Sequence, residues 1–124
     1  MKKTIPFDLL RQGENIYFNI FRLQQLEQLL NKPIIEIIQK QYMGIDFCLA
    51  GLQVGLKHHY PHANAQFYAE KIEEYLDAGN GTINDFIIPV INAIMVSGII
   101  GEVPKEEAEK NVVRTAKKEK PSGV

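Results

Sequence analysis

The segment FIIPVINAIMVSGII, Phe86–Ile100, restricts the fold of this chain more than any other feature. Its apolar residues recur at helical spacing but occupy both faces of the predicted helix. The segment is shorter than the roughly 20 apolar residues that cross a bilayer, and it contains Pro89 and Asn92. A helix that is apolar all round must lie at the centre of its fold or be covered by a partner. We therefore expect a mainly α protein that buries this helix and has no membrane partner.

The two faces of this predicted helix have different expected roles. The stripe expected to reach the core is Ile83, Ile87, Val90, Ile91 and Ile94. The opposite face still carries Ile88, Met95, Val96 and Ile99. A small domain has little room to enclose both faces. We therefore predict that the second set binds a partner, either another protein or a second copy of this chain in a homo-oligomer.

The sequence before Phe86 predicts an N-terminal β-hairpin and four more helices. From Thr4 to Ile20, apolar and polar residues alternate on both sides of a turn near Gly13, which is the period of two paired strands. The predicted helices cover residues 20–31, 33–42, 47–60 and 65–78. With the apolar segment as the last helix, we expect a compact orthogonal bundle of about five helices that follows the hairpin.

Helix boundaries are predicted from residues that satisfy free backbone N–H groups. The expected N-caps are Asn19, Asp46 and Asn64. Thr82 and Asp85 have the spacing of a capping-box variant that opens the last helix. Pro61 must end the third helix, whose expected buried stripe is Ile45, Leu49, Leu52, Leu56 and His59. Gly51 and Gly55 lie one turn apart on this helix and would let a neighbouring element approach its backbone closely.

Length and charge predict one domain over residues 1–101 and a charged tail over residues 102–124. We expect the tail to be disordered, because it has no apolar face to offset the entropy of ordering it. The chain has 14 Lys and Arg against 15 Asp and Glu. Because this balance lacks a basic excess, we expect no nucleic-acid partner.

Cys48 is the only cysteine, so the chain can form neither an internal disulfide nor a multi-cysteine zinc site. Its apolar neighbours predict a core thiol instead of a nucleophile. The N-terminus begins with two lysines, but Pro6 and Asp8 interrupt the apolar region that a signal peptide needs. We therefore expect a cytoplasmic protein. No pattern of catalytic residues is recognisable, so we expect neither an enzyme nor a cofactor.

All three histidines lie in GLKHHYPHANAQ, Gly55–Gln66. His58 and His62 have a spacing that binds zinc on a continuous helix, but Pro61 lies between them and no third ligand is evident. We therefore predict no metal site. His59 is expected to lie on the buried stripe with one ring nitrogen hydrogen-bonded. His58 is expected near the carbonyl end of the helix, where a cationic ring is favoured.

The order of these elements, with several short motifs, resembles the small tail assembly chaperones of long-tailed phages, especially those of the gene transfer agent type. In that family a strand pair precedes a helix with a Leu-Glu pair, which Leu26 and Glu27 match. A later family motif is an Ala-Gly-Leu step, then Gly-Leu, a basic residue and a histidine pair before a proline. It is matched by Ala50, Gly51, Leu52, Gly55, Leu56, Lys57, His58, His59 and Pro61. The resemblance spans residues 4–100.

The resemblance implies a non-enzymatic protein that coats the long tape-measure protein in the host-cell cytoplasm during tail assembly. Tail tube protein then displaces it, and the finished virion lacks it. One alternative is a structural tail or tail-tube component that stays in the virion, which mass spectrometry of purified particles would reveal. Another is a metal-dependent enzyme built around the histidines, which metal analysis of the purified protein would reveal.

Overall fold

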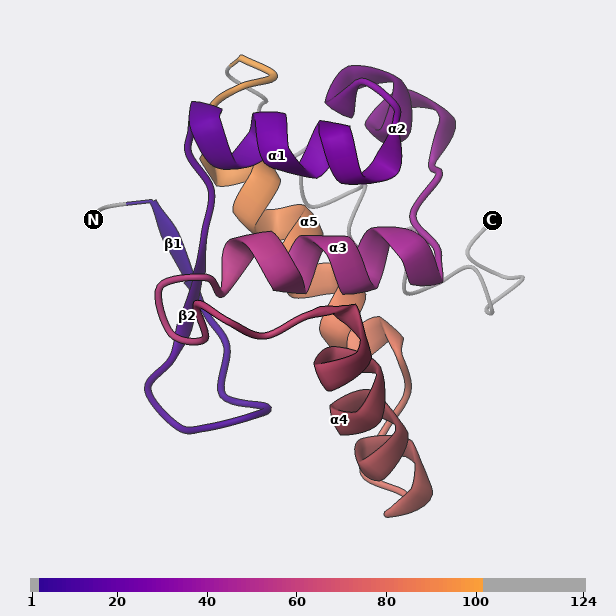
Figure 1. Ribbon diagram of the computed structural model, residues 1–124. Helices are drawn as coiled ribbons and strands as arrows, with labels where there is room; N and C mark the ends of the chain where they lie inside the picture. The colour runs from indigo at the N-terminus through magenta and orange to yellow at the C-terminus, as the bar shows by residue number, and fades with distance from the viewer. Residues whose placement is uncertain (1–2, 102–124) are drawn as a thin grey trace, which may run out of the picture.

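Five helices and a two-stranded hairpin make up residues 3–101, the part of the chain that this computed structural model describes (Figure 1). The strands are β1 (Thr4–Pro6) and β2 (Asn15–Tyr17). The helices are α1 (Ile20–Leu30), α2 (Ile34–Lys40), α3 (Ile45–Gly55), α4 (Ala65–Asp77) and α5 (Asn84–Val96). The predicted fold class, a mainly α protein with an N-terminal hairpin, is confirmed. The predicted tail, residues 102–124, lies outside the described residues.

The hairpin is antiparallel and turns where the sequence predicts. Gly13 has a φ of 90°, which favours glycine, and its N–H donates to Oδ1 of Asp8 at 2.7 Å. The predicted alternation buries Ile16 and Phe18 almost completely. It fails at Ile20, which is 71% exposed because it is the first residue of α1 and no longer follows the strand period. The hairpin therefore contributes one face to the core and leads directly into α1.

Helix α3 lies at the centre of the fold, in contact with α1, α4, α5 and β2 (Figure 1). Its buried residues occupy most of its circumference, because elements pack against it from several sides. They are Phe47, Cys48, Ala50, Gly51, Leu52, Val54 and Gly55. The predicted single stripe is therefore wrong in part. Ile45 is 64% exposed, and Leu49 is only partly buried.

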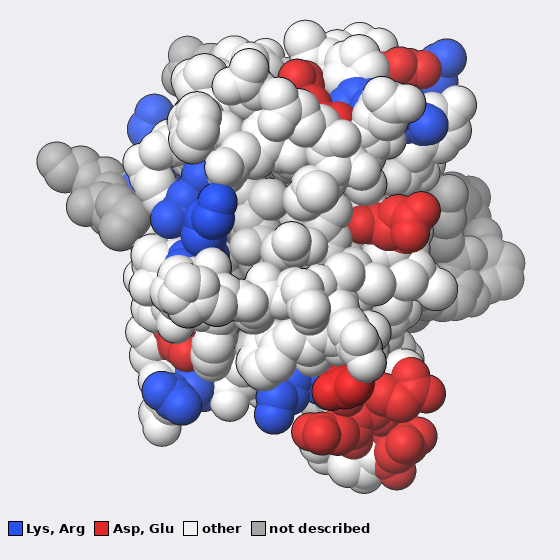
Figure 2. All heavy atoms as spheres, viewed as in Figure 1, with Lys and Arg blue, Asp and Glu red and all other residues white. Residues whose placement is uncertain are grey.

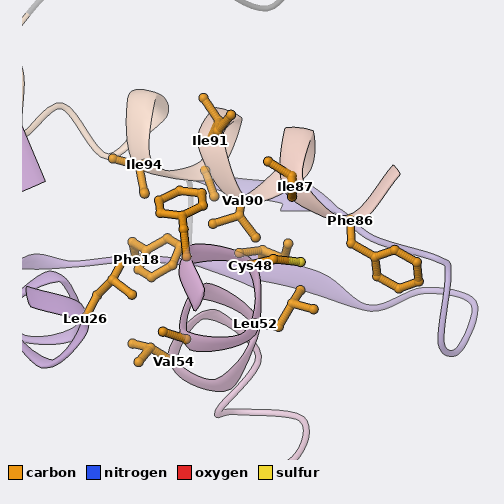
Figure 3. Close-up of a cluster of buried hydrophobic side chains, with 14 of the residues drawn as sticks. Phe18, Leu26, Cys48, Leu52, Val54, Phe86, Ile87, Val90, Ile91 and Ile94 are labelled. Atoms are coloured by element: carbon orange, nitrogen blue, oxygen red, sulfur yellow. The ribbon is translucent and has the colours of Figure 1, made fainter. Parts of the chain in front are cut away.

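Helix α5 runs behind α3 and supplies a large part of the core, as its composition predicts (Figure 1). Its buried residues are Phe86, Ile87, Val90, Ile91, Ala93 and Ile94. Figure 3 shows Val90 on the side of α5 that faces Cys48 of α3. Within residues 3–101, none of the helices has the length and apolar character needed to cross a membrane.

The two glycines of α3 allow its neighbours to approach closely. A Cβ atom added at Gly51 would lie 2.5 Å from Cγ1 of Val90, and one added at Gly55 would lie 2.6 Å from Cγ2 of Ile16. Both distances are too short for carbon atoms in contact. The glycines therefore let α5 and β2 pack directly against the backbone of α3, as their one-turn spacing predicts.

The predicted N-caps are confirmed at two positions and wrong at the third. Oδ1 of Asn19 accepts from the N–H of Arg22 at 2.8 Å, and Oδ1 of Asn64 accepts from the N–H of Phe67 at 2.9 Å. Asp46 does not cap α3. Gly44 occupies that position, because α3 begins at Ile45, two residues earlier than an Asp46 cap requires, and Asp46 lies in the first turn. In the first turn, the negative carboxylate of Asp46 still interacts favourably with the positive end of the helix dipole.

The predicted capping box at α5 forms only in part. Oδ2 of Asp85 accepts from the N–H of Thr82 at 3.3 Å. The N-cap itself is Ile83, which makes no side-chain capping bond, so the expected contribution of the Thr82 hydroxyl is wrong. Oδ2 of Asp85 also accepts from the Tyr75 hydroxyl at 2.6 Å, which joins the start of α5 to α4.

The prediction that Pro61 ends the third helix is also wrong. Helix α3 ends at Gly55, and Leu56 is its fully buried C-cap. The carbonyl of Leu56 then accepts from the N–H groups of both His59 and Tyr60 at 2.9 Å, so the chain turns tightly before the proline. Burial of Leu56 and packing of Tyr60 against the start of α4 decide this end.

Candidate partner-binding surface

The predicted partner face of α5 presents little exposed surface. Met95 and Ile99 are partly buried and pack against the core, and Ile88 is also partly buried. Val96, at 42%, is the one member of the set that is exposed. Three of the four residues that the helical period predicts to bind a partner are therefore partly covered within this chain.

Most of the large exposed apolar side chains lie instead on α1, on α2, in the connection between α2 and α3, and at the start of α3. They are Ile20, Phe21, Leu29, Ile35, Tyr42 and Ile45. The sequence pattern places Ile20 and Ile45 in the core and gives no direct sign that the other four are exposed. The available signal was the position of Phe21 and Leu29 on α1, away from the stripe that contains Leu23 and Leu26. Because α1 contacts both α2 and α3, large apolar side chains exposed on these elements make this part of the molecule a candidate interaction surface.

Three hollows follow one another between α1 and α3. The first, of about 490 Å³, lies at the N-terminal end of α3 and is lined by Tyr42 and Ile45 among others. The middle one, of about 230 Å³, shares Leu30 and Asp46 with the first. The third, of about 320 Å³, shares Leu29 and Gln53 with the middle one and extends to Lys57 and Pro61. Because neighbouring hollows share lining residues, we treat the three together as one surface depression, the α1–α3 groove.

Between Lys57 in the third hollow and Asp46, which lines both the first and the middle hollow, the lining residues of the groove are uncharged. Its third hollow has Gln25, Gln28 and Gln53 at its sides and Lys57 at its end. Asp46 lies toward the other end. In the described part of the chain, neither Lys57 nor Asp46 belongs to an ion pair. Figure 2 shows this face as largely uncharged, with basic surface on the left and acidic surface on the right.

The histidine cluster joins β2, α1 and the turn after α3. Nη1 of Arg22 donates to Nδ1 of His58 at 3.0 Å, so that nitrogen must be unprotonated. Nε2 of His58 then donates to Oδ1 of Asn15 at 2.7 Å. The N–H of Asn15 in turn donates to Nε2 of His59 at 3.1 Å. These contacts assign one tautomer to each imidazole ring. Through them, Arg22, His58, His59 and Asn15 join the hairpin to α1 and to the turn after α3.

The expected cationic His58 is wrong. Desolvation by burial, then the neighbouring His59 and Arg22, lower its pKa from 6.5 to about 4. The physical reason is that α3 has already ended, so the ring lies beside a guanidinium instead of beside free helix carbonyls. His59 is partly buried with one ring nitrogen bonded, as predicted, whereas His62 is exposed.

Neither metal binding nor thiol chemistry finds support in the geometry. Among residues 3–101, no group of three or more His, Cys, Asp or Glu side chains is placed to hold a metal ion. Cys48 is completely buried, and this burial raises the pKa of its thiol to about 12. The thiol therefore stays protonated and behaves as a small apolar side chain, as the sequence predicts.

A buried polar cluster that the sequence analysis missed lies under the hairpin turn. Glu14 is only 6% exposed, and its Oε1 has no hydrogen-bond partner among the described residues. The Tyr60 hydroxyl bonds the Glu14 side chain, and burial together with this bond raises the pKa of Tyr60 to about 12. The hydroxyl of Tyr68 is buried nearby and also lacks a partner in the described part of the chain. A polar residue at a turn gave no signal that it would be buried.

Comparisons with known proteins give no indication of the function. No protein-family model matches the chain, and no curated protein or solved structure matches it either.

Proposed function

We propose that this protein is a non-enzymatic tail assembly chaperone that binds the tape-measure protein of a phage or prophage in the host-cell cytoplasm. The observation that carries the proposal is the number of large apolar side chains that are exposed on α1, on α2 and around the start of α3. A chaperone for a long apolar client needs such a surface while the client is unassembled, and the surface has no covering element in the described part of the chain.

The motif that resembles the chaperone family supports the proposal through its structural roles. Gly51 and Gly55 let α5 and β2 pack against α3. His58 and His59 join the end of α3 to the hairpin through Asn15. These residues hold the hairpin, α1 and α3 together, so they maintain the face on which the exposed apolar side chains lie.

Co-expression with the tape-measure protein tests the proposal. The tape-measure gene is expressed alone, with this chain, and with a variant that carries Phe21→Glu and Leu29→Glu. We expect the native chain to raise the soluble fraction of the tape-measure protein and to co-purify with it, and the variant to do neither. Because both positions are exposed, circular dichroism should show that the variant is folded.

Mass spectrometry of purified particles tests the alternative, a structural tail or tail-tube component. A chaperone is expected to be absent from finished virions and present in lysates that contain unassembled tails. Stoichiometric recovery of the chain from virions would support the alternative and contradict the proposal.

A further inference from the structure

We infer that the α1–α3 groove receives one amphipathic helix of the client, with the helix's acidic end at Lys57 and its basic end at Asp46. This inference rests on the proposed function, because it identifies the client segment that the chaperone holds. It also changes the predicted partner site from the face of α5 to the groove.

The dimensions of the groove suit a helix of about three turns. Its wall along α3 extends from Ile45 to Gly55, which at 1.5 Å per residue is about 15 Å, and Lys57 lies in the turn just beyond. Its central wall is formed by aliphatic side chains, including Leu29, Leu49 and Ala50. A helix that lays an apolar stripe at positions i, i+3, i+4 and i+7 along such a wall is a common mode of recognition.

The sides of the groove select a helix that is uncharged along its middle. Gln25, Gln28 and Gln53 offer amide donors and acceptors but no charge. A charged residue in the middle of the bound helix would lose water without gaining an ionic partner, which is costly. Residues with amide or hydroxyl side chains can instead bond the glutamines.

The ends of the groove set the orientation of the helix. Lys57 and Asp46 are exposed and belong to no ion pair in the described residues. Lys32 also lines the hollow near Asp46, but its ammonium lies over the Tyr42 ring, 5.7 Å from the centroid. Helices favour acidic residues at the N-terminus and basic residues at the C-terminus. A client helix with this usual charge order would therefore run parallel to α1, with its N-terminus at Lys57.

A synthetic peptide tests the groove without the tape-measure protein. The probe is a capped helix of about three to four turns with two N-terminal glutamates, a stripe of alanine and leucine, and two C-terminal lysines. Binding to the full chain is measured by fluorescence anisotropy and by amide chemical-shift changes. We expect shifts at Gln25, Leu49 and Gln53, and none with a peptide of the same composition whose stripe is scrambled.

Negative charge placed along the groove should weaken this binding. Gln28→Glu with Gln53→Glu is expected to lower the affinity about tenfold or more. A carboxylate at position 28 lies in the hollow of Lys57, where it would repel the acidic end of the peptide, and one at position 53 would lose water when the helix covers it. The matched control, Gln12→Glu with Gln39→Glu, adds the same charge at exposed positions that do not line the groove, and should change the affinity less than about twofold. Lys57→Glu, at an exposed position, provides a second variant should the first pair unfold.

Orientation is read with a nitroxide label on the acidic end of the peptide. The label should broaden the amide signals of Lys57 and His58 and leave Asp46 sharp. In the variant Lys57→Glu with Asp46→Lys, the broadening should move to the other end of the groove. Equal affinities for the groove and control variants, or broadening that ignores the charge swap, would overturn the inference.

Other occupants would give different results. Nuclear Overhauser contacts between the groove and residues 102–124 of the same free molecule would assign it to the chain's own end. Broadening that grows with protein concentration would assign it to a second copy. Either result overturns the inference. Undiminished co-purification of the tape-measure protein with the Gln28 and Gln53 variant would also overturn it while the chaperone proposal stands. Peptide binding without tape-measure binding would contradict only the chaperone proposal.

Discussion

At the scale of single residues, His58 couples the stability of the hairpin contact to pH. Its folded pKa of about 4 lies below its ordinary value of 6.5, so the unfolded chain binds more protons between these values. The stabilising effect is therefore complete above pH 6.5 and is lost as the pH falls toward 4. Protonation of Nδ1 would remove the acceptor that Arg22 uses and place two cations side by side.

We expect the melting temperature of the native chain to fall between pH 7 and pH 4.5 by more than that of His58→Gln, which has no imidazole to protonate. Solvent exposure of the ring will keep the difference small. Circular dichroism melts at several pH values measure it, and His62→Gln is the control because His62 takes no part in the hydrogen bonds of the histidine cluster. Parallel pH profiles for the native chain and His58→Gln would contradict the assignment.

Unlike the His58 ring, which is hydrogen-bonded, the Tyr68 hydroxyl is buried without a partner among the described residues, so we expect it to contribute nothing to stability. Because the hydroxyl has no partner in the described residues, Tyr68→Phe should leave the free energy of unfolding unchanged or raise it by up to about 1 kcal/mol. Tyr60→Phe, the comparison variant, loses the bond to Glu14 and should lower it by about 1 kcal/mol. Urea unfolding measures both. Strong destabilisation by Tyr68→Phe would show that its hydroxyl is bonded, for example to a buried water.

At the scale of elements, the contact between α3 and α5 depends on the missing side chain of Gly51. Alanine would gain helix propensity, but its Cβ would meet the fully buried Val90. We expect a net loss of about 1 kcal/mol or more, because the core cannot take extra volume without moving α5. Gly44→Ala is the control, since its Cβ would meet open space. A Gly51→Ala variant as stable as native would mean that α5 shifts without cost.

The exposed side of α5 can be separated from its buried side by two neighbouring substitutions. Val96→Glu should change the free energy of unfolding by no more than about 0.5 kcal/mol, because Val96 is 42% exposed. Met95→Glu should lower it by about 2 kcal/mol or more, because Met95 packs against the core and a carboxylate there loses water. If Met95→Glu is tolerated and reduces tape-measure binding, the original α5 face is the partner surface after all. Urea unfolding and co-purification measure the two effects.

At the scale of the whole molecule, every helix within residues 3–101 contributes buried residues to one shared core. We therefore expect deletion of residues 105–124 to leave the melting temperature unchanged within error. The segment has no continuous apolar face that would offset the entropy of ordering it. Calorimetry of the two chains tests this, and a drop of several degrees would show that the segment docks on the rest of the chain.

Features with local physical causes were predictable from the sequence alone. Asn19 and Asn64 cap helices because a side-chain oxygen reaches an N–H three residues ahead, which needs no other element. The hairpin, the five helices, the buried Cys48 and the burial of α5 follow in the same way from turn residues, period and composition. Predicted helix boundaries and buried stripes were wrong where tertiary packing overrides local preference, as at the end of α3.

Only the tertiary structure decided which apolar residues stay exposed and which distant residues meet. Helix α3 is surrounded, so its stripe broadens to most of its surface, while Ile45 at its end remains exposed. The groove joins Leu29 of α1 to Gln53 of α3, and no spacing within either helix reveals that they are neighbours. Periodicity tells which side of a helix is apolar, but the number of elements packed around that helix determines how much of that side is covered.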